Sequence, residues 1–168
     1  MNTAQFIQAV GPAAKASMQQ TGLSAAFVIA EAALESAWGG SELAQRGKNL
    51  FGVKVYPGWE GATLSIPTRE YLEGQWQMVP AQWCLYLSWE DSILDHARFL
   101  FAMPRYAEAL RVRNQPAAFA QAVQEAGYAT DPLYAKKIIS IVNAHSLDAW
   151  DVPQTQWALV EWANVQVA

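Results

Sequence analysis

The stretch SAAFVIAEAALESAWGG, residues 24–40, decides the fold of this chain. Its apolar residues cover nearly the whole circumference of a helix, which is typical of a helix buried on all sides. Ser24 is a suitable N-cap and Gly39-Gly40 a stop, so the pattern predicts a central helix that runs to Trp38. Glu35 stands inside this apolar helix, where a charged side chain is rarely found without a reason.

Further periodic patterns predict a mostly helical α+β fold around this central helix. Apolar residues at helical spacing predict helices over 3–20, from the Ser88 cap to Pro104, and over 106–113, 116–125 and 132–145. Two extended segments, 62–71 and 76–87, are joined by a turn at Glu73-Gly74, which predicts a small antiparallel hairpin. Residues 47–61 have the composition of a loop. A helical lobe beside a β lobe leaves a cleft, and such clefts commonly bind ligands.

The length of 168 residues suits one domain with its own hydrophobic core. We assign residues 1–148 to this domain. Residues 149–168 differ in composition, with three tryptophans, and we treat them as a C-terminal tail.

Composition excludes several classes of function. The net charge is −4, so the chain lacks the basic footprint of a nucleic-acid-binding protein, and affinity for anionic cell-wall polymers must come from a local site. Cys84 is the single cysteine, so no internal disulfide can form. No signal peptide is visible in residues 1–5, and no apolar run approaches the roughly 20 residues that span a bilayer. His96 and His145 lie far apart, so we expect neither a metal nor another cofactor.

Glu35 is the residue with the strongest indication of chemistry. A carboxyl held against apolar groups is desolvated, which raises its pKa, and a protonated carboxyl can donate a proton to a leaving glycosidic oxygen. Glu31 lies one helical turn earlier on the same face, and if both side chains are buried, each disfavours ionisation of the other. In the alternative interpretation, Glu31 faces solvent and Glu35 is a cap or salt-bridge partner.

Four sequence blocks carry a family resemblance. They are ALESAWG (33–39), NLFGVK (49–54), TREY (68–71) and AGYATDPLYAKKI (126–138). In this order and spacing they resemble glycoside hydrolase family 73, which includes flagellar rod-associated peptidoglycan hydrolases, bacterial autolysins and phage endolysins. The resemblance covers about residues 3–146.

The resemblance implies a lysozyme-like helical lobe and an endo-β-N-acetylglucosaminidase activity. Such an enzyme cuts the β-1,4 bond between N-acetylglucosamine and N-acetylmuramic acid in peptidoglycan. The resemblance places the general acid at Glu35, the second carboxylate at Glu70, and a substrate-placing or catalytic aromatic residue at Tyr128. The alternative for Glu70 is a solvent-facing strand residue, with the N-acetyl group of the substrate taking part in its place.

Four residues near these blocks are expected to bind substrate: Trp38, Asn49, Phe51 and Tyr71. Asn49 and Phe51 either line the cleft or fix their loop, and Trp38 can serve both the core and the cleft floor. Tyr134 is expected in the core, and Asp131 is expected to cap the final helix.

Two other functions stay open at the level of sequence. A muramidase or lytic transglycosylase also uses a helical glutamate, and a binding module would keep the cleft without turnover. In each case the expected partner is a peptidoglycan strand, bound by a monomer without nucleic acid or membrane insertion. We expect action on the bacterial cell wall, in the periplasm or outside the cell, after release through a holin or a dedicated secretion route. A phage endolysin, a secreted effector and a flagellar protein all fit.

Overall fold

Helix α2 (Ala25–Ser36) forms the centre of the fold. The computed structural model describes residues 1–72 and 74–152, with only the backbone of residues 71 and 72. Ten of the twelve residues of α2 are buried. The Ser24 hydroxyl caps the helix by accepting a hydrogen bond from the Phe27 N–H at 3.0 Å. The predicted central, buried helix is therefore confirmed.

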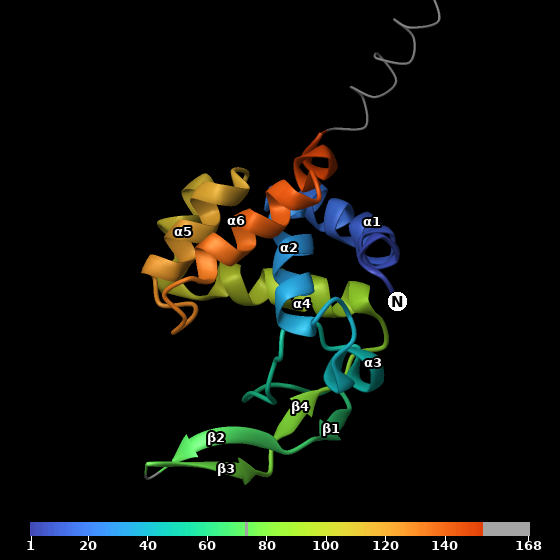
Figure 1. The fold of residues 1–168 in the computed structure, drawn as a ribbon, viewed down its shortest axis with the longest axis vertical. Helices are drawn as coiled ribbons and strands as arrows, with labels where there is room; N and C mark the ends of the chain where they lie inside the picture. The colour runs from blue at the N-terminus through green and yellow to red at the C-terminus, as the bar shows by residue number, and fades with distance from the viewer. Residues whose placement is uncertain (73, 153–168) are drawn as a thin grey trace, which may run out of the picture.

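Longer helices pack around α2 to form the helical lobe (Figure 1). Within the described residues they are α1 (Thr3–Thr21), α4 (Trp89–Ala102), α5 (Pro116–Glu125) and α6 (Tyr134–Ala144), with short 3-10 helices η1 (Pro104–Tyr106), η2 (Ala109–Val112) and η3 (Leu147–Asp151). Buried apolar side chains fill the space between the helices; the rings of Phe27 and Phe119, for example, pack edge to face at 4.7 Å. This single core supplies the main driving force for folding.

The β lobe lies below the helices in Figure 1. It contains α3 (Glu42–Gly47) and the strands β1 (Thr63–Ser65), β2 (Thr68–Leu72), β3 (Gln75–Val79) and β4 (Gln82–Cys84). β2 pairs with β3 in antiparallel register, with Glu70 opposite Gln77, and β1 pairs with β4, with Leu64 opposite Trp83. The predicted α+β class, mostly helical with a small antiparallel lobe, is confirmed.

The predicted hairpin is divided into two ladders. Pro67 lies between β1 and β2, and Pro80 lies between β3 and β4. Because proline has no N–H to donate, two prolines at the same level of the hairpin interrupt its hydrogen bonds. The helix α3 was not predicted.

Three helix boundaries differ from the prediction. Helix α2 ends at Ser36 instead of Trp38, because residues 37–39 have positive φ angles of 51°, 58° and 72°. The helix expected over 106–113 is replaced by η1 and η2. Helix α6 begins at Tyr134 and has no side-chain cap, so the prediction that Asp131 caps it is wrong; the Asp131 carboxylate accepts a hydrogen bond from the Leu133 N–H in the turn before the helix.

The last described residues pack back onto the helical lobe. The Asp151 carboxylate accepts hydrogen bonds from the Ser24 hydroxyl at 2.7 Å and from the Ala26 N–H at 3.1 Å. The Trp150 ring lies so close to Gly11 that a Cβ there would come within 2.3 Å of it. The rest of the expected tail, residues 153–168, lies outside the described part. Among the described helices, none has the length and apolar character required to cross a bilayer.

We predict that Asp151→Ala lowers the free energy of unfolding by about 1–2 kcal/mol, because the carboxylate satisfies donors at the start of α2. Urea unfolding followed by circular dichroism measures this change. Asp148→Ala is the matched control, since Asp148 is exposed on the same 3-10 helix. Equal unfolding midpoints for wild type and Asp151→Ala would contradict the prediction.

Candidate active site

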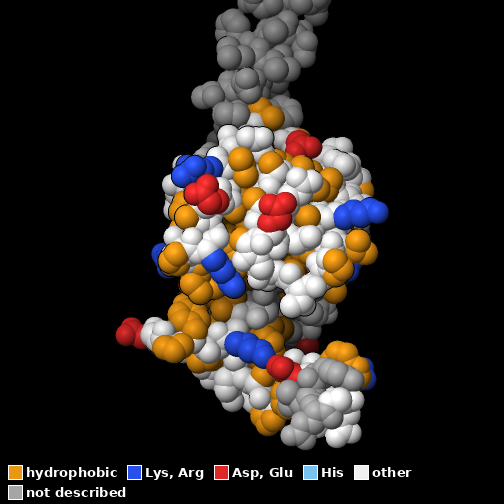
Figure 2. All heavy atoms as spheres, turned by 90° about the vertical axis from the view of Figure 1, so that its left-hand side faces the viewer, with side chains coloured by type: hydrophobic (Ala, Val, Ile, Leu, Met, Phe, Trp, Pro, Cys, Tyr) orange, Lys and Arg blue, Asp and Glu red, His pale blue; other side chains and the backbone are white. Residues whose placement is uncertain are grey.

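A cleft of about 1200 Å³ lies on the helical lobe, at its border with the loop that leads to the β lobe. Helix α2, the loop over residues 51–54, helix α4 and the loop over residues 128–131 all contribute to its lining. Hydrophobic side chains gather where the two lobes meet (Figure 2). Apolar clefts with a few converging polar groups are the usual form of a ligand-binding site.

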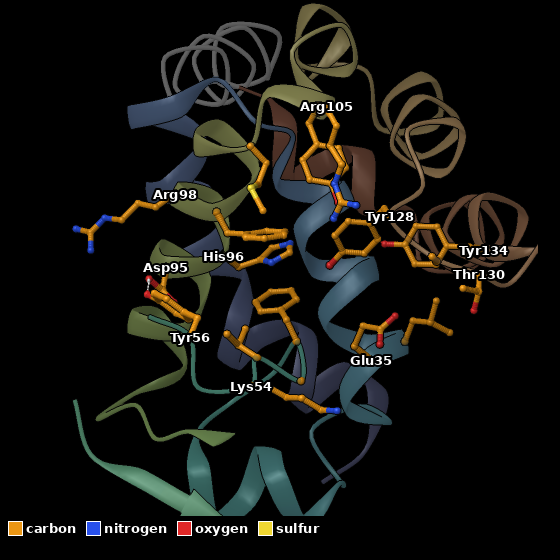
Figure 3. A pocket seen from close by; sticks show the side chains of 18 of the residues that line it. Glu35, Lys54, Tyr56, Asp95, His96, Arg98, Arg105, Tyr128, Thr130 and Tyr134 are labelled. Atoms are coloured by element: carbon orange, nitrogen blue, oxygen red, sulfur yellow. Dashed lines mark hydrogen bonds between the residues drawn. The ribbon is translucent and has the colours of Figure 1, made fainter. Parts of the chain in front are cut away.

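Glu35 lies at the end of α2 and points into this cleft (Figure 3). The left-handed turn that follows is held by Ser36, whose hydroxyl accepts a hydrogen bond from the Gly39 N–H at 2.7 Å. A Cβ on Gly39 would meet the rings of Phe6 and Trp89 at 3.0 Å, so this turn requires a glycine. The local sequence thus ends the helix one residue beyond the acid and leaves its carboxyl in the cleft.

The carboxyl of Glu35 is exposed to solvent in the open cleft, while protein atoms surround it on its other sides. This partial desolvation raises the pKa of Glu35, and the nearby charge of Glu31 raises it further, against the smaller opposing influence of His96 and Lys137. Because its turn of α2 borders the cleft, the desolvation that the sequence predicts for Glu35 is partial. The raised pKa nevertheless follows from its surroundings.

Glu31 is the fully buried acid of α2. Its Oε2 lies 2.9 Å from Nε2 of His96 on α4, and its Oε1 accepts a hydrogen bond from the Tyr134 hydroxyl of α6 at 2.8 Å. The interpretation in which Glu31 faces solvent is therefore wrong. The carboxylate joins three helices of the lobe.

Burial alone would raise the pKa of Glu31, but the His96 ring and the hydrogen bonds from His96, Tyr128 and Tyr134 outweigh it. The net effect holds the pKa below the ordinary value, so Glu31 stays ionised. Two carboxyls one turn apart are thus driven in opposite directions, which is the pattern that separates acid and base roles in enzymes.

Tyr128 and Phe51 line the cleft near these acids. Burial raises the pKa of Tyr128 well above its ordinary value, and the charges of Glu31 and Glu35 add to this, so its hydroxyl remains a hydrogen-bond donor. The Phe51 ring stacks on the ring of His96, with centroids 4.0 Å apart. Figure 3 shows Glu35, Tyr128 and His96 converging on one region of the pocket.

Other predicted site residues lie outside the cleft lining. Asn49 is buried and fixes the loop, since its amide bonds to the backbone of Val53 and to the carbonyl of Cys84. Trp38 packs edge to face on Phe6 and on His145. The side chain of Tyr71 lies outside the described part of the structure.

Glu70 does not line the cleft itself but contacts a residue that does. Its Oε1 accepts a hydrogen bond from Nζ of Lys54 at 2.7 Å, and Lys54 lines the cleft. About a third of the Glu70 side chain is exposed. The structure therefore brings Glu35, Tyr128 and Phe51 together and leaves Glu70 at the border of the site.

Sequence reasoning missed the role of His96 and the polar contact of Tyr134. The sequence indicates His96 only as a possible metal ligand, because its actual partner, Glu31, stands 65 residues away in the chain. Tyr134 is in the core, as expected, but its hydroxyl serves Glu31. Among the described residues, no cluster of three or more potential metal ligands is found.

Comparisons with known proteins agree with this geometry. A family model described as mannosyl-glycoprotein endo-beta-N-acetylglucosaminidase matches residues 11–147. The peptidoglycan hydrolase FlgJ of Pseudomonas aeruginosa is 38% identical over 143 residues, which are 83% of this chain and 36% of that protein. The exo-glucosaminidase LytG of Bacillus subtilis is 38% identical over 130 residues, 74% of this chain and 45% of that protein. The chain thus spans less than half the length of these relatives.

A solved structure shows the same fold. The C-terminally truncated glycoside hydrolase domain of FlgJ from Salmonella typhimurium superposes with a TM-score of 0.72 at 34% identity. The match covers 85% of this chain and 97% of that one. The similarity therefore extends over nearly the whole of that hydrolase domain.

We predict that Glu31→Gln lowers the pKa of Glu35, because the substitution removes the negative charge that helps to raise it. Carbon-13 NMR titration of the side-chain carboxyls measures the midpoint directly. Glu42→Gln is the control, since Glu42 is an exposed residue of α3 in an ion pair with Arg46. An unchanged Glu35 midpoint in a folded Glu31→Gln protein would exclude the coupling.

Proposed function

Because the chain belongs to the glucosaminidase family of glycoside hydrolases, we propose that it is an endo-β-N-acetylglucosaminidase acting on peptidoglycan. It cleaves the β-1,4 bond between N-acetylglucosamine and N-acetylmuramic acid, with Glu35 as general acid. The observation that carries this proposal is the position of Glu35, a carboxyl with a raised pKa that faces a cleft. The relatives named as peptidoglycan hydrolase and exo-glucosaminidase support the substrate and the reaction.

The raised pKa suits the first chemical step. A general acid must carry its proton when the glycosidic bond breaks, and the Glu35 carboxyl then gives this proton to the departing oxygen. Activity that depends on protonated Glu35 declines as the pH rises through its pKa. Since burial and the Glu31 charge raise this pKa, the decline falls at higher pH than for an ordinary glutamate.

Tyr128 lies beside the acid in the cleft. Its hydroxyl keeps its proton and lies near both carboxylates of α2. We assign it a substrate-placing role, in which it donates a hydrogen bond to a sugar oxygen. Phe51 offers an apolar ring to the same ligand, since it lines the cleft beside His96. Trp38 and Asn49 act indirectly, by fixing the turn and the loop that border the cleft.

Glu70 is the proposed base of an inverting mechanism. In that mechanism the second carboxylate takes a proton from a water molecule, which attacks the anomeric carbon on the face opposite the leaving group. The Lys54–Glu70 pair is exposed, and such pairs stabilise a protein by about 1 kcal/mol or less. A substrate in the cleft can therefore release Glu70 from Lys54 at small cost.

A lytic transglycosylase is the second candidate, and one observation favours it. Besides Glu35, the acids that line the cleft among the described residues are Asp95 and Asp131, and both have partners within the protein. A transglycosylase needs only one acid, because the substrate's own hydroxyl takes the place of water. Its products end in a 1,6-anhydro sugar.

The proposed setting is the bacterial cell wall, reached as a monomer by a holin or another release route. Peptidoglycan strands are the proposed partner, because the relatives are named for that substrate. A non-catalytic binding module would not require an acid with a raised pKa in its cleft.

We predict that Glu35→Gln lowers kcat by about 10²–10⁴-fold, the usual contribution of a general acid, because glutamine cannot donate the proton. Lysis of purified sacculi, followed by turbidity and by clearing in a cell-wall gel, measures the loss. Glu125→Gln, an exposed glutamate at the end of α5, is expected to retain full activity.

Mass spectrometry of the released fragments identifies the bond that is cut. The proposal requires N-acetylglucosamine at the new reducing end. Anhydro-muramic ends would establish the transglycosylase, reducing muramic acid would establish a muramidase, and intact strands with wild-type protein would leave a binding module.

We predict that Glu70→Gln lowers kcat more than KM changes, and that azide restores turnover because it attacks without a base. Lys54→Met is the matched control, because it breaks the same ion pair but keeps the carboxylate. Equal losses of kcat in the two variants would show that only the ion pair matters. They would remove Glu70 from the mechanism.

A further inference from the structure

One corner of the cleft places an exposed arginine, Arg105, over the ring of a buried tyrosine, Tyr106. Arg105 and Tyr106 of η1 both line the cleft. None of the ion pairs found among the described residues includes Arg105. The Tyr106 side chain is fully buried, and its hydroxyl has no hydrogen-bond partner in the described part of the chain. Buried polar groups are normally satisfied, so an unpaired one in a cleft wall indicates a ligand.

The other cations of the cleft differ from Arg105. Lys54 pairs with Glu70 and Lys137 pairs with Asp131. The guanidinium of Arg98 points away from the pocket in Figure 3, whereas that of Arg105 points into it, toward Tyr128. Arg105 therefore supplies the positive charge that is available inside this corner.

The two donors are close to each other and to the proposed acid. The guanidinium carbon of Arg105 lies 4.7 Å from the centroid of the Tyr106 ring. The rings of Tyr106 and Tyr128 lie 6.0 Å apart, and Tyr128 is near enough to Glu35 to feel its charge. This corner therefore lies beside Tyr128, the aromatic residue next to the proposed acid.

We propose that Arg105 and Tyr106 form a subsite for a carboxylate carried by the glycan strand. This inference rests on the proposed function and specifies its substrate. A guanidinium binds a carboxylate through two parallel hydrogen bonds, and a phenol adds a neutral donor.

A local cationic subsite explains how a negatively charged protein can bind an anionic polymer. The chain carries a net charge of −4, which repels an anionic polymer. A carboxylate subsite attracts that polymer at one place and favours strands with acidic substituents over neutral ones. The carboxylate can belong to a stem peptide, or to the lactyl group of a muramic acid that has lost its stem.

Binding measurements in the Glu35→Gln background test the subsite without turnover. Calorimetry would compare three tetrasaccharides of alternating N-acetylglucosamine and N-acetylmuramic acid. One carries peptide stems, one carries the same stems with their carboxylates converted to amides, and one lacks stems. Each is measured with Arg105→Gln, and with Arg111→Gln as control, since Arg111 is an exposed arginine of η2 paired with Glu108.

We expect Arg105→Gln to weaken binding of a carboxylate ligand by about tenfold, as loss of a charge-assisted pair does, and to leave the amidated ligand unaffected. Amidation of the ligand and the Arg105→Gln substitution together should reduce the binding affinity no more than either change alone. A loss with the stem-bearing ligand assigns the carboxylate to the stem, and a loss with the stem-free ligand assigns it to the lactyl group. Tyr106→Phe should give a smaller loss with the same charge dependence.

Equal losses with acidic and amidated ligands, or no loss with either, would overturn the subsite. An unchanged affinity of the Tyr106→Phe variant for the carboxylate ligand would overturn the role assigned to the Tyr106 hydroxyl. These failures are distinct from failure of the proposed function, which the clearing of sacculi by wild-type protein tests by itself.

Discussion

The buried carboxylate of Glu31 is the interaction on which the rest of the structure depends. An ion taken out of water costs several kcal/mol unless its partners replace the lost hydration, so this carboxylate requires both His96 and Tyr134. These partners come from α4 and α6, which are distant from α2 in sequence. The requirement therefore fixes how three helices meet, at the wall of the cleft. Apolar packing alone would hold the helices together but would tolerate other orientations more readily.

The same requirement sets the chemistry of Glu35. An ionised group one turn away raises the pKa of the cleft acid, and it does so from a position that solvent ions cannot reach. Because screening is weak for buried charges, the influence persists at ordinary ionic strength. One helix thus carries one acid whose pKa is lowered and one whose pKa is raised, and their difference comes from burial and partners.

The sequence predicts the helical lobe well, because its signals are local. The apolar run of α2, the Ser24 cap and the spacing of α1, α5 and α6 all follow from patterns within a single element. The sequence also indicates Glu35 as the candidate general acid, because it is an acidic residue in an apolar helix and because the family resemblance places the acid there. It does not reveal the partner of Glu31, because His96 stands 65 residues away and no local pattern links them. Pro67 and Pro80 were visible, yet their effect depends on a strand register that only the folded chain defines.

The two lobes hold the proposed acid and the proposed base with unequal rigidity, and this difference has a mechanistic meaning. On the helical side, Glu35 stands one turn from Glu31 on α2, a helix that cannot shift without breaking the buried contacts of Glu31 with His96 and Tyr134. On the β side, Glu70 is held by an exposed ion pair with Lys54, which contributes little to stability. Adjustment to a bound strand therefore falls on the β lobe. An acid must meet one oxygen in a defined direction, whereas a base acts through water and tolerates more variation in its position. The more rigid helical lobe thus carries the proposed acid, whose position must be defined more closely.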